Sequence, residues 1–145
     1  MALCMCDRRQ ISIGMVASVA ALAPGRALSA VSPETVRTFI AEAERMKREA
    51  VAKGDQPFGA VVVRGSEIAG YGPSRVVTNR DPNAHAERVA LWDAQAKLGR
   101  KDLADCVIYS TSPPCAACQN ALAAAMVARM FHGPAAVDAG APKSW

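Results

Sequence analysis

One histidine, one glutamate and two cysteines have residue types and spacings that suit zinc chemistry. One residue separates His85 from Glu87, and two residues separate Cys115 from Cys118. A histidine and two cysteines supply three ligands, the number that a catalytic zinc ion takes when its fourth position is kept for water. If Pro114 opens a helix, both sulfurs lie on one face of its first turn, where the helix dipole favours thiolate. We therefore expect His85, Cys115 and Cys118 to bind Zn²⁺.

Glu87 is better interpreted as a proton carrier beside the metal than as a fourth ligand. It lies two residues beyond His85, so the two side chains point in different directions on a helix. A structural zinc site and a redox-active Cys-x-x-Cys are the competing interpretations. A structural zinc needs a fourth protein ligand, and neither Cys106 nor His132 stands at a recognised spacing for one. A redox pair would not require the histidine and the glutamate.

These residues form the pattern H-x-E followed by P-C-x-x-C, which is known from zinc-dependent deaminases. Together with Pro57-Phe58-Gly59 upstream, the pattern resembles the cytidine deaminase superfamily. The nearest branch is that of guanine deaminase, yeast-type cytosine deaminase and bacterial tRNA adenosine deaminase. The resemblance runs from about Val31 to Gly133. It implies a zinc-dependent hydrolase that converts an amino-substituted nucleobase or nucleoside to the oxo form and releases ammonia.

The resemblance also implies roles for individual residues. Water activated by zinc would attack the ring carbon that bears the amino group. Glu87 would carry the proton of that water to the adjacent ring nitrogen and help to protonate the leaving ammonia. Phe58, Ser74 and Ala86 stand at substrate-binding positions of the family. For Phe58, a place in the hydrophobic core is an equally good interpretation.

Two residues depart from the pattern of the family. Ser74 stands where relatives of the guanine and tRNA adenosine branches usually place an asparagine. An asparagine amide offers both donors and an acceptor to a base edge, whereas a serine has one hydroxyl on a shorter side chain. Pro113 stands where relatives commonly have glutamate, which removes a charge and a backbone N–H near the zinc loop.

Residues 1–30 have the pattern of an export signal. Arg8-Arg9 precedes a mildly apolar run, and small residues end the segment at Ala27–Ala30. The arginine pair resembles a twin-arginine signal, whose pathway exports folded proteins. The run is too short for a membrane span. We expect a signal over 1–30, a deaminase domain over 31–145 and a periplasmic or otherwise exported protein. The alternative is an ordinary N-terminal helix of a cytoplasmic protein.

Charge and cysteine count limit the partners of the chain. The 145 residues suit one domain, and five cysteines, an odd number, argue against a disulfide framework. The formal net charge is +4. No basic run stands after the proposed signal, and RNA binding depends on phosphate contacts. We therefore expect a small nucleobase or nucleoside of the guanine or cytosine type, with no membrane contact in the mature form. A tRNA-specific adenosine deaminase is the second interpretation, and a non-catalytic zinc-binding module is the third. The family resemblance further implies a homodimer.

The elements that must position these residues alternate between helix and strand. Ser32-Pro33 opens a helix that ends at Gly54, and Asp81-Pro82 opens another that ends at Gly99. Apolar runs predict strands over 58–63, 68–71 and 128–132, a buried parallel strand over 106–111, and a helix from Cys115 to about Val127. The tail from Gly133 to Trp145 has no periodicity. We expect a three-layer α/β/α, cytidine-deaminase-like fold with a mixed sheet of four to five strands and helices on both faces.

Overall fold

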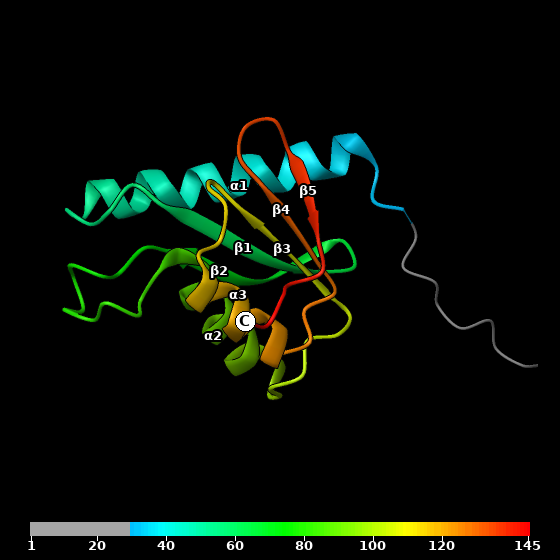
Figure 1. Ribbon diagram of the computed structural model, residues 1–145. Coiled ribbons are helices and arrows are strands. Elements are labelled where there is room, and N and C mark those ends of the chain that lie inside the picture. The colour runs from blue at the N-terminus through cyan, green and yellow to red at the C-terminus, as the bar shows by residue number, and fades with distance from the viewer. Residues whose placement is uncertain (1–29) are drawn as a thin grey trace, which may run out of the picture.

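A mixed sheet of five strands, in the order β2-β1-β3-β4-β5, forms the centre of the molecule (Figure 1). The computed structural model describes residues 30–145, so the predicted export signal lies outside the described part except for its last residue. Helix α1 covers one face of the sheet, and α2 and α3 lie on the other. The three-layer prediction is thereby confirmed. The helices are α1 (Pro33–Ala52), α2 (Ala86–Leu98) and α3 (Ala116–Ala124), and the strands are β1 (Gly59–Arg64), β2 (Glu67–Pro73), β3 (Cys106–Ser110), β4 (Arg129–His132) and β5 (Val137–Gly140).

Helix α1 begins and ends where the sequence predicted. The Ser32 hydroxyl accepts a hydrogen bond from the backbone N–H of Thr35 at 3.1 Å, and Pro33 occupies the first helical position. Gly54, with φ of +76°, follows the helix in the left-handed region that glycine tolerates. The buried side chains of α1 pack on Val61 and Val63 of β1.

Two helices lie almost directly on the sheet because glycines face them. A Cβ atom on Gly59 would lie 2.1 Å from the carbonyl oxygen of Ala43 in α1. On the other face, Cβ atoms on Gly70 and Gly72 would lie 2.2 Å and 2.1 Å from carbonyl oxygens of α2. No side chain fits at these distances. The missing side chains therefore set the height of α1 and α2 above the sheet.

The second helix starts later than predicted. Asp81-Pro82 was expected to open it, but the Asp81 carboxylate accepts a hydrogen bond from the backbone N–H of Asn83 at 2.8 Å and closes a separate turn. The N-cap of α2 is His85. Aspartate can cap a helix or close a turn, and the spacing of the apolar residues did not distinguish these two roles. Gly99, with φ of +65°, ends the helix as expected.

The C-terminal third differs from the prediction in three respects. Helix α3 ends at Ala124, because Met126 adopts a φ of +60°. Strand β3 is parallel to β4 but antiparallel to β1, so the predicted parallel strand has a parallel neighbour on one side only. The tail forms an additional strand, β5, which pairs with β4.

The exposed edge of β2 is covered by side chains of both neighbouring helices. The backbone N–H of Tyr71 donates to the carboxylate of Asp93 in α2 at 2.8 Å. The Tyr71 ring has the guanidinium of Arg45 5.5 Å from its centroid and the ammonium of Lys97 at 4.9 Å. Within residues 30–145, no helix combines the length and apolar character needed to cross a bilayer.

Candidate metal centre

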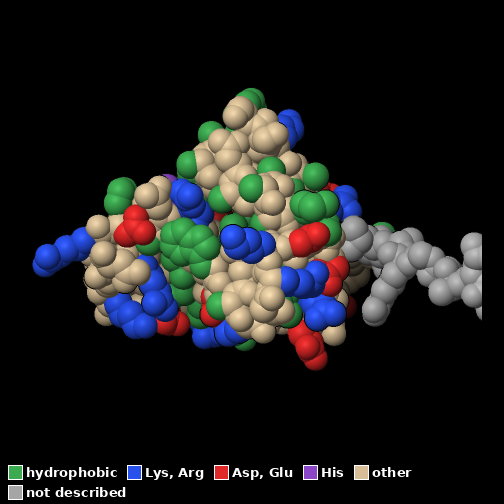
Figure 2. All heavy atoms as spheres, turned by 90° about the horizontal axis from the view of Figure 1, so that it is seen from below, with side chains coloured by type: hydrophobic (Ala, Val, Ile, Leu, Met, Phe, Trp, Pro, Cys, Tyr) green, Lys and Arg blue, Asp and Glu red, His purple; other side chains and the backbone are tan. Residues whose placement is uncertain are grey.

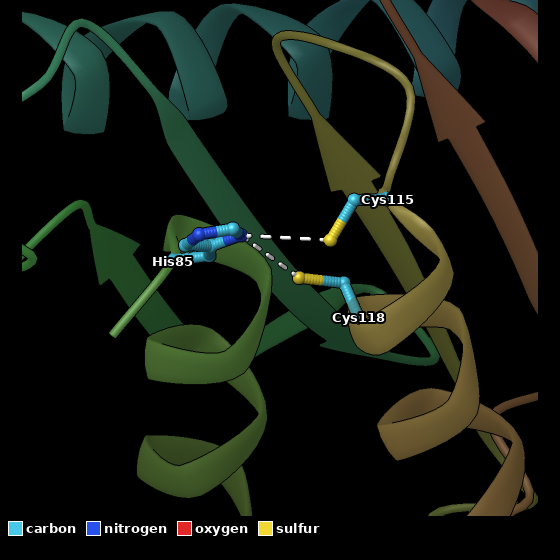
Figure 3. Close-up of side chains that lie close together, drawn as sticks. All are labelled: His85, Cys115 and Cys118. Atoms are coloured by element: carbon cyan, nitrogen blue, oxygen red, sulfur yellow. Dashed lines mark hydrogen bonds between the residues drawn. The ribbon is translucent and has the colours of Figure 1, made fainter. Parts of the chain in front are cut away.

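The predicted zinc ligands meet where two helices begin (Figure 3). His85 is the N-cap of α2. Cys115 is the N-cap of α3, and Cys118 lies in the first turn of that helix. Helix α3 follows the carboxyl end of β3 after a short loop, so the cysteines lie at the sheet edge where α/β folds usually bind ligands.

The distances among the three side chains fit a tetrahedral zinc ion. His85 Nδ1 lies 3.6 Å from Cys115 Sγ and 3.4 Å from Cys118 Sγ. Zinc bonds of about 2.05 Å to nitrogen and about 2.3 Å to sulfur place the two ligand atoms about 3.6 Å apart at a tetrahedral angle. Among residues 30–145, the group of candidate ligands at this point has these three members. Three ligands leave a fourth position open, as in catalytic zinc sites.

A bound dication would change the protonation of Cys118. Its side chain is fully buried, and burial, followed by the charge of Glu87, raises the pKa of the Cys118 thiol. The position at a helix start does not outweigh these effects. A dication beside the sulfur would reverse them, because zinc binds the thiolate. The three side chains therefore fit Zn²⁺ in chemistry as well as in geometry.

Glu87 points from α2 toward the cysteines. Its side chain is 5% exposed, and its Oε2 accepts a hydrogen bond from Cys118 Sγ at 3.7 Å. Burial raises the pKa of the Glu87 carboxyl, partly offset by hydrogen bonds with its own backbone and with Cys118. The structure thus places a carboxylate next to the ligands without making it one of them.

A cavity of about 160 Å³ opens beside the ligands. It is lined by Gln56, Phe58, His85, Ala86, Glu87, Ser112, Pro113 and Cys115. Phe58, at 40% exposed, faces this cavity and is not a buried core residue. Two of the three predicted substrate-binding residues, Phe58 and Ala86, therefore lie at the cavity, and contact with a substrate stays a prediction for them.

The third predicted substrate-binding residue, Ser74, lies outside the cavity lining. It is 2% exposed, and its hydroxyl donates to Asp55 Oδ1 at 2.9 Å. The same carboxylate accepts hydrogen bonds from the backbone N–H groups of Gln56, Val77 and Thr78 and from the Thr78 hydroxyl. Asp55 thus joins the segment before β1 to the loop after β2.

Asp55 and Gln56 were not among the predicted site residues. Their signal in the sequence is weak: one acidic residue between the glycine that ends α1 and the apolar run of β1. Such a residue is usually solvated, yet Asp55 is only 8% exposed. The partners that bury it stand about twenty residues away, so local patterns could not identify them.

The C-terminal tail lies along α3 and does not line the cavity. The backbone N–H groups of Lys143 and Trp145 donate to the side chains of Gln119 and Asn120, at 3.4 Å and 2.8 Å. Trp145 is 77% exposed. The tail is therefore held beside the cysteine helix with its last side chain in solvent.

Comparisons with known proteins agree with this geometry. Residues 33–133 match the cytidine and deoxycytidylate deaminase zinc-binding region. Guanine deaminase of Bacillus subtilis is 37% identical over 103 residues, which are 70% of this chain and 66% of that protein. The X-ray structure of that enzyme superimposes with a TM-score of 0.64, covering 66% of this chain and 62% of the other. A tRNA-specific adenosine deaminase of Aquifex aeolicus is 35% identical over 93 residues, 64% of this chain and 62% of that protein. The chain thus spans slightly less than two thirds of the length of these relatives.

Loss of one sulfur ligand should abolish zinc binding. We expect Cys115→Ala to purify with almost no zinc, because two protein ligands hold the ion far more weakly than three. Cys106→Ala is the matched control. Cys106 is a fully buried cysteine whose pKa burial raises to about 12, and it does not belong to the ligand group. Its variant should keep about one zinc per chain by elemental analysis. Equal zinc content in the two variants would contradict the site.

The free energy of unfolding should depend on pH through the Asp55 carboxyl. Burial by itself would raise the pKa of Asp55, but its hydrogen bonds, first that from the Thr78 N–H, lower it from 3.8 to about 2. The carboxylate therefore stabilises the fold above its ordinary pKa, and the contribution is lost as the pH falls from about 4 through about 2. Asp55→Asn should lower the free energy of unfolding by about 2 kcal/mol at pH 7. In urea titrations, this difference from the wild type should shrink below pH 3. A difference that stays constant with pH would refute the assignment.

Proposed function

The chain belongs to the cytidine and deoxycytidylate deaminase family, and on this premise we propose that it is a zinc-dependent hydrolytic deaminase of a nucleobase or nucleoside. The substrate loses its amino group as ammonia and gains an oxo group. Guanine-type and cytosine-type substrates are favoured. The guanine deaminase of B. subtilis, at 37% identity, supports the guanine type.

One observation carries the proposal: a buried carboxylate, three zinc ligands and a small cavity lie together. Glu87, His85 and Cys115 all line the cavity of about 160 Å³. Pockets for drug-sized ligands occupy about 300–1,000 Å³, so this cavity suits a single ring system. The substrate therefore enters with its amino-bearing carbon toward Glu87 and the metal ligands.

The zinc ion and the residues that line the cavity have separate roles in the proposed reaction. Zinc, when bound, supplies a Lewis acid that acidifies a water molecule. Glu87 takes one proton of this water on its carboxylate and passes it to the ring nitrogen while the water oxygen bonds to the amino-bearing carbon. Glu87 then takes the second proton from the new hydroxyl and passes it to the amine, so that the carbon–nitrogen bond breaks, the carbonyl forms and ammonia leaves. Its burial excludes bulk water, which keeps the proton between the carboxylate and the substrate. Phe58 offers a ring face for stacking, and Ala86 leaves room for the substrate because its side chain is a single methyl group.

A tRNA-specific adenosine deaminase is the second candidate, favoured by the 35% identity to the A. aeolicus protein. Nucleic-acid binding relies on clustered lysine and arginine side chains. On the face formed by α2 and α3, such side chains are interspersed with acidic ones (Figure 2). Two ion pairs lie in or next to α2: Lys97–Asp93 within the helix and Arg100–Asp105 just after it. This mixed charge supports a small substrate over tRNA.

Export and dimer formation complete the proposal. The arginine pair Arg8-Arg9 and the small residues at 27–30 support export through the twin-arginine pathway and a periplasmic location. Export of a folded, zinc-loaded protein would protect Cys115 and Cys118 from forming a disulfide in an oxidising compartment. The homodimer is supported by the family resemblance alone, and sedimentation equilibrium measures it.

Replacing the carboxylate of Glu87 should separate zinc binding from turnover. We expect Glu87→Gln to keep its zinc, because the residue is not a ligand, and to lower kcat by about 10²-fold to 10⁴-fold, the usual contribution of a proton carrier. Release of ammonia from guanine, cytosine, their nucleosides and an anticodon stem-loop is the measurement. Glu67→Gln, on the exposed start of β2, is the matched control. Near-wild-type turnover by the Glu87 variant would exclude the mechanism, and preferred turnover of the stem-loop would promote the second candidate.

The export proposal predicts where the protein accumulates. In a bacterial host with a twin-arginine pathway, we expect the wild type in the periplasmic fraction with its first residues removed. The double variant Arg8→Lys, Arg9→Lys should remain in the cytosolic fraction, because the pathway depends on the arginine pair. Mass spectrometry of the N-terminus and fractionation measure both. A cytosolic wild type with an intact N-terminus would disprove export.

A further inference from the structure

The cavity beside the metal centre is lined by one side-chain amide, that of Gln56. Apart from the metal ligands and Glu87, the polar side chains of its lining are Gln56 and Ser112. Gln56 is half-buried in the lining of the cavity. Within residues 30–145, its side-chain amide takes part in no hydrogen bond, whereas its backbone takes part in two. The amide therefore remains available to a ligand.

The backbone of Gln56 is held firmly on both sides. Its N–H donates to Asp55 Oδ1 at 2.8 Å, and its carbonyl oxygen accepts from the N–H of Phe58 at 2.8 Å. Asp55 is in turn fixed by the loop after β2, through Ser74 and Thr78. A side chain on a fixed backbone loses less entropy on binding than one on a mobile loop. Gln56 is thus a pre-positioned polar group at the cavity.

Ser74 does not offer a polar group to the cavity in the structure. Its hydroxyl proton is donated to Asp55, and its side chain is nearly inaccessible at 2% exposed. A hydroxyl has one proton to donate, so a substrate could accept from Ser74 only if the bond to Asp55 broke. Leaving the buried Asp55 oxygen without that partner would cost free energy. Ser74 therefore presents no group to the cavity, whereas the Gln56 side chain lines it.

We propose that the side-chain amide of Gln56 reads the oxo-bearing edge of the substrate ring and so selects bases that carry a lactam. An amide presents a donor and an acceptor side by side, which complement the carbonyl and adjacent N–H of a lactam. Guanine and cytosine keep such a carbonyl away from the carbon that loses its amine, whereas adenine has none. The inference rests on the proposed deaminase function and names the substrate class of its site.

Matched substrates with and without the oxo group test this role. Guanine and 2-aminopurine share the amine that is removed and differ in the oxo group, as do cytosine and 4-aminopyrimidine. For the zinc-loaded full chain, the ratio of kcat/KM between the members of each pair is measured in the wild type and in Gln56→Met. Because intrinsic ring reactivity is the same for both proteins, it cancels when the two ratios are compared.

We expect the wild type to prefer the oxo member, and Gln56→Met to lose about 10-fold to 100-fold of that preference, the usual effect of leaving a polar partner unpaired. The loss should appear mainly as a higher KM for the oxo substrate, because the contact exists before the chemical step. Gln95→Met is the matched control. Gln95 is also half-buried, but it lies near the far end of α2 and donates to the Lys101 carbonyl. Its variant should retain the wild-type preference.

The outcomes separate the inference from the function on which it rests. An active wild type whose preference survives in Gln56→Met, or that shows no preference, overturns the role of Gln56 and leaves the deaminase intact. A wild type that releases no ammonia from any of these bases, nucleosides or the stem-loop overturns both. Zinc content and circular dichroism establish that each variant is folded. If Gln56→Met does not fold, Gln56→Glu, which keeps the side-chain length and loses the donor, should show the same loss of preference.

Discussion

The whole arrangement depends on two helix starts that bring the ligand atoms of His85, Cys115 and Cys118 within 4.8 Å of one another. His85 and Cys115 are thirty residues apart in the chain and belong to different helices, so only the sheet beneath can bring them together. Gly70 and Gly72 let α2 rest on β2 with no side chain between them. A larger residue at either position would lift the helix and carry His85 and Glu87 away from the cysteines. Close packing and metal geometry are therefore one constraint.

Three chain segments reach the cavity because antiparallel pairing brings their ends to one edge of the sheet. The start of β1 lies beside the end of β3, where the Thr111 N–H donates to the Gly59 carbonyl at 2.9 Å. The segment before β1 supplies the aromatic and amide side chains, and the loop after β3 leads to the cysteines. The third segment is the loop after β2, which leads to the start of α2. Asp55 holds this loop by hydrogen bonds to Ser74, Val77 and Thr78. A cavity built from such ends can vary in specificity while the sheet is kept.

Most of the features that the sequence predicted depend on residues close together in the chain, and the features that it missed depend on contacts between distant residues. Helix α1, the glycine stops and the Cys-x-x-Cys spacing follow from neighbouring residues. The meeting of His85 with the cysteines, which start thirty residues further on, was predicted from the ligands that zinc takes, and the structure places them together. Ser74 was predicted from the family pattern, without its partner Asp55, because that contact spans 19 residues. Strand β5 is short and half-exposed, so it carries no apolar pattern and forms only by pairing with β4. The start of α2 was misplaced because aspartate caps turns and helices alike.

The covered edge at β2 limits how copies of this protein can associate. An open strand edge is a template on which another chain can add a strand, the usual beginning of fibrous aggregates. Here the Tyr71 N–H already donates a hydrogen bond to the Asp93 carboxylate. The charged groups of Arg45 and Lys97 lie against the Tyr71 ring. A second molecule would have to displace a carboxylate and bury two charges to extend the sheet at that point. This edge thus acts as a terminator against runaway polymerisation.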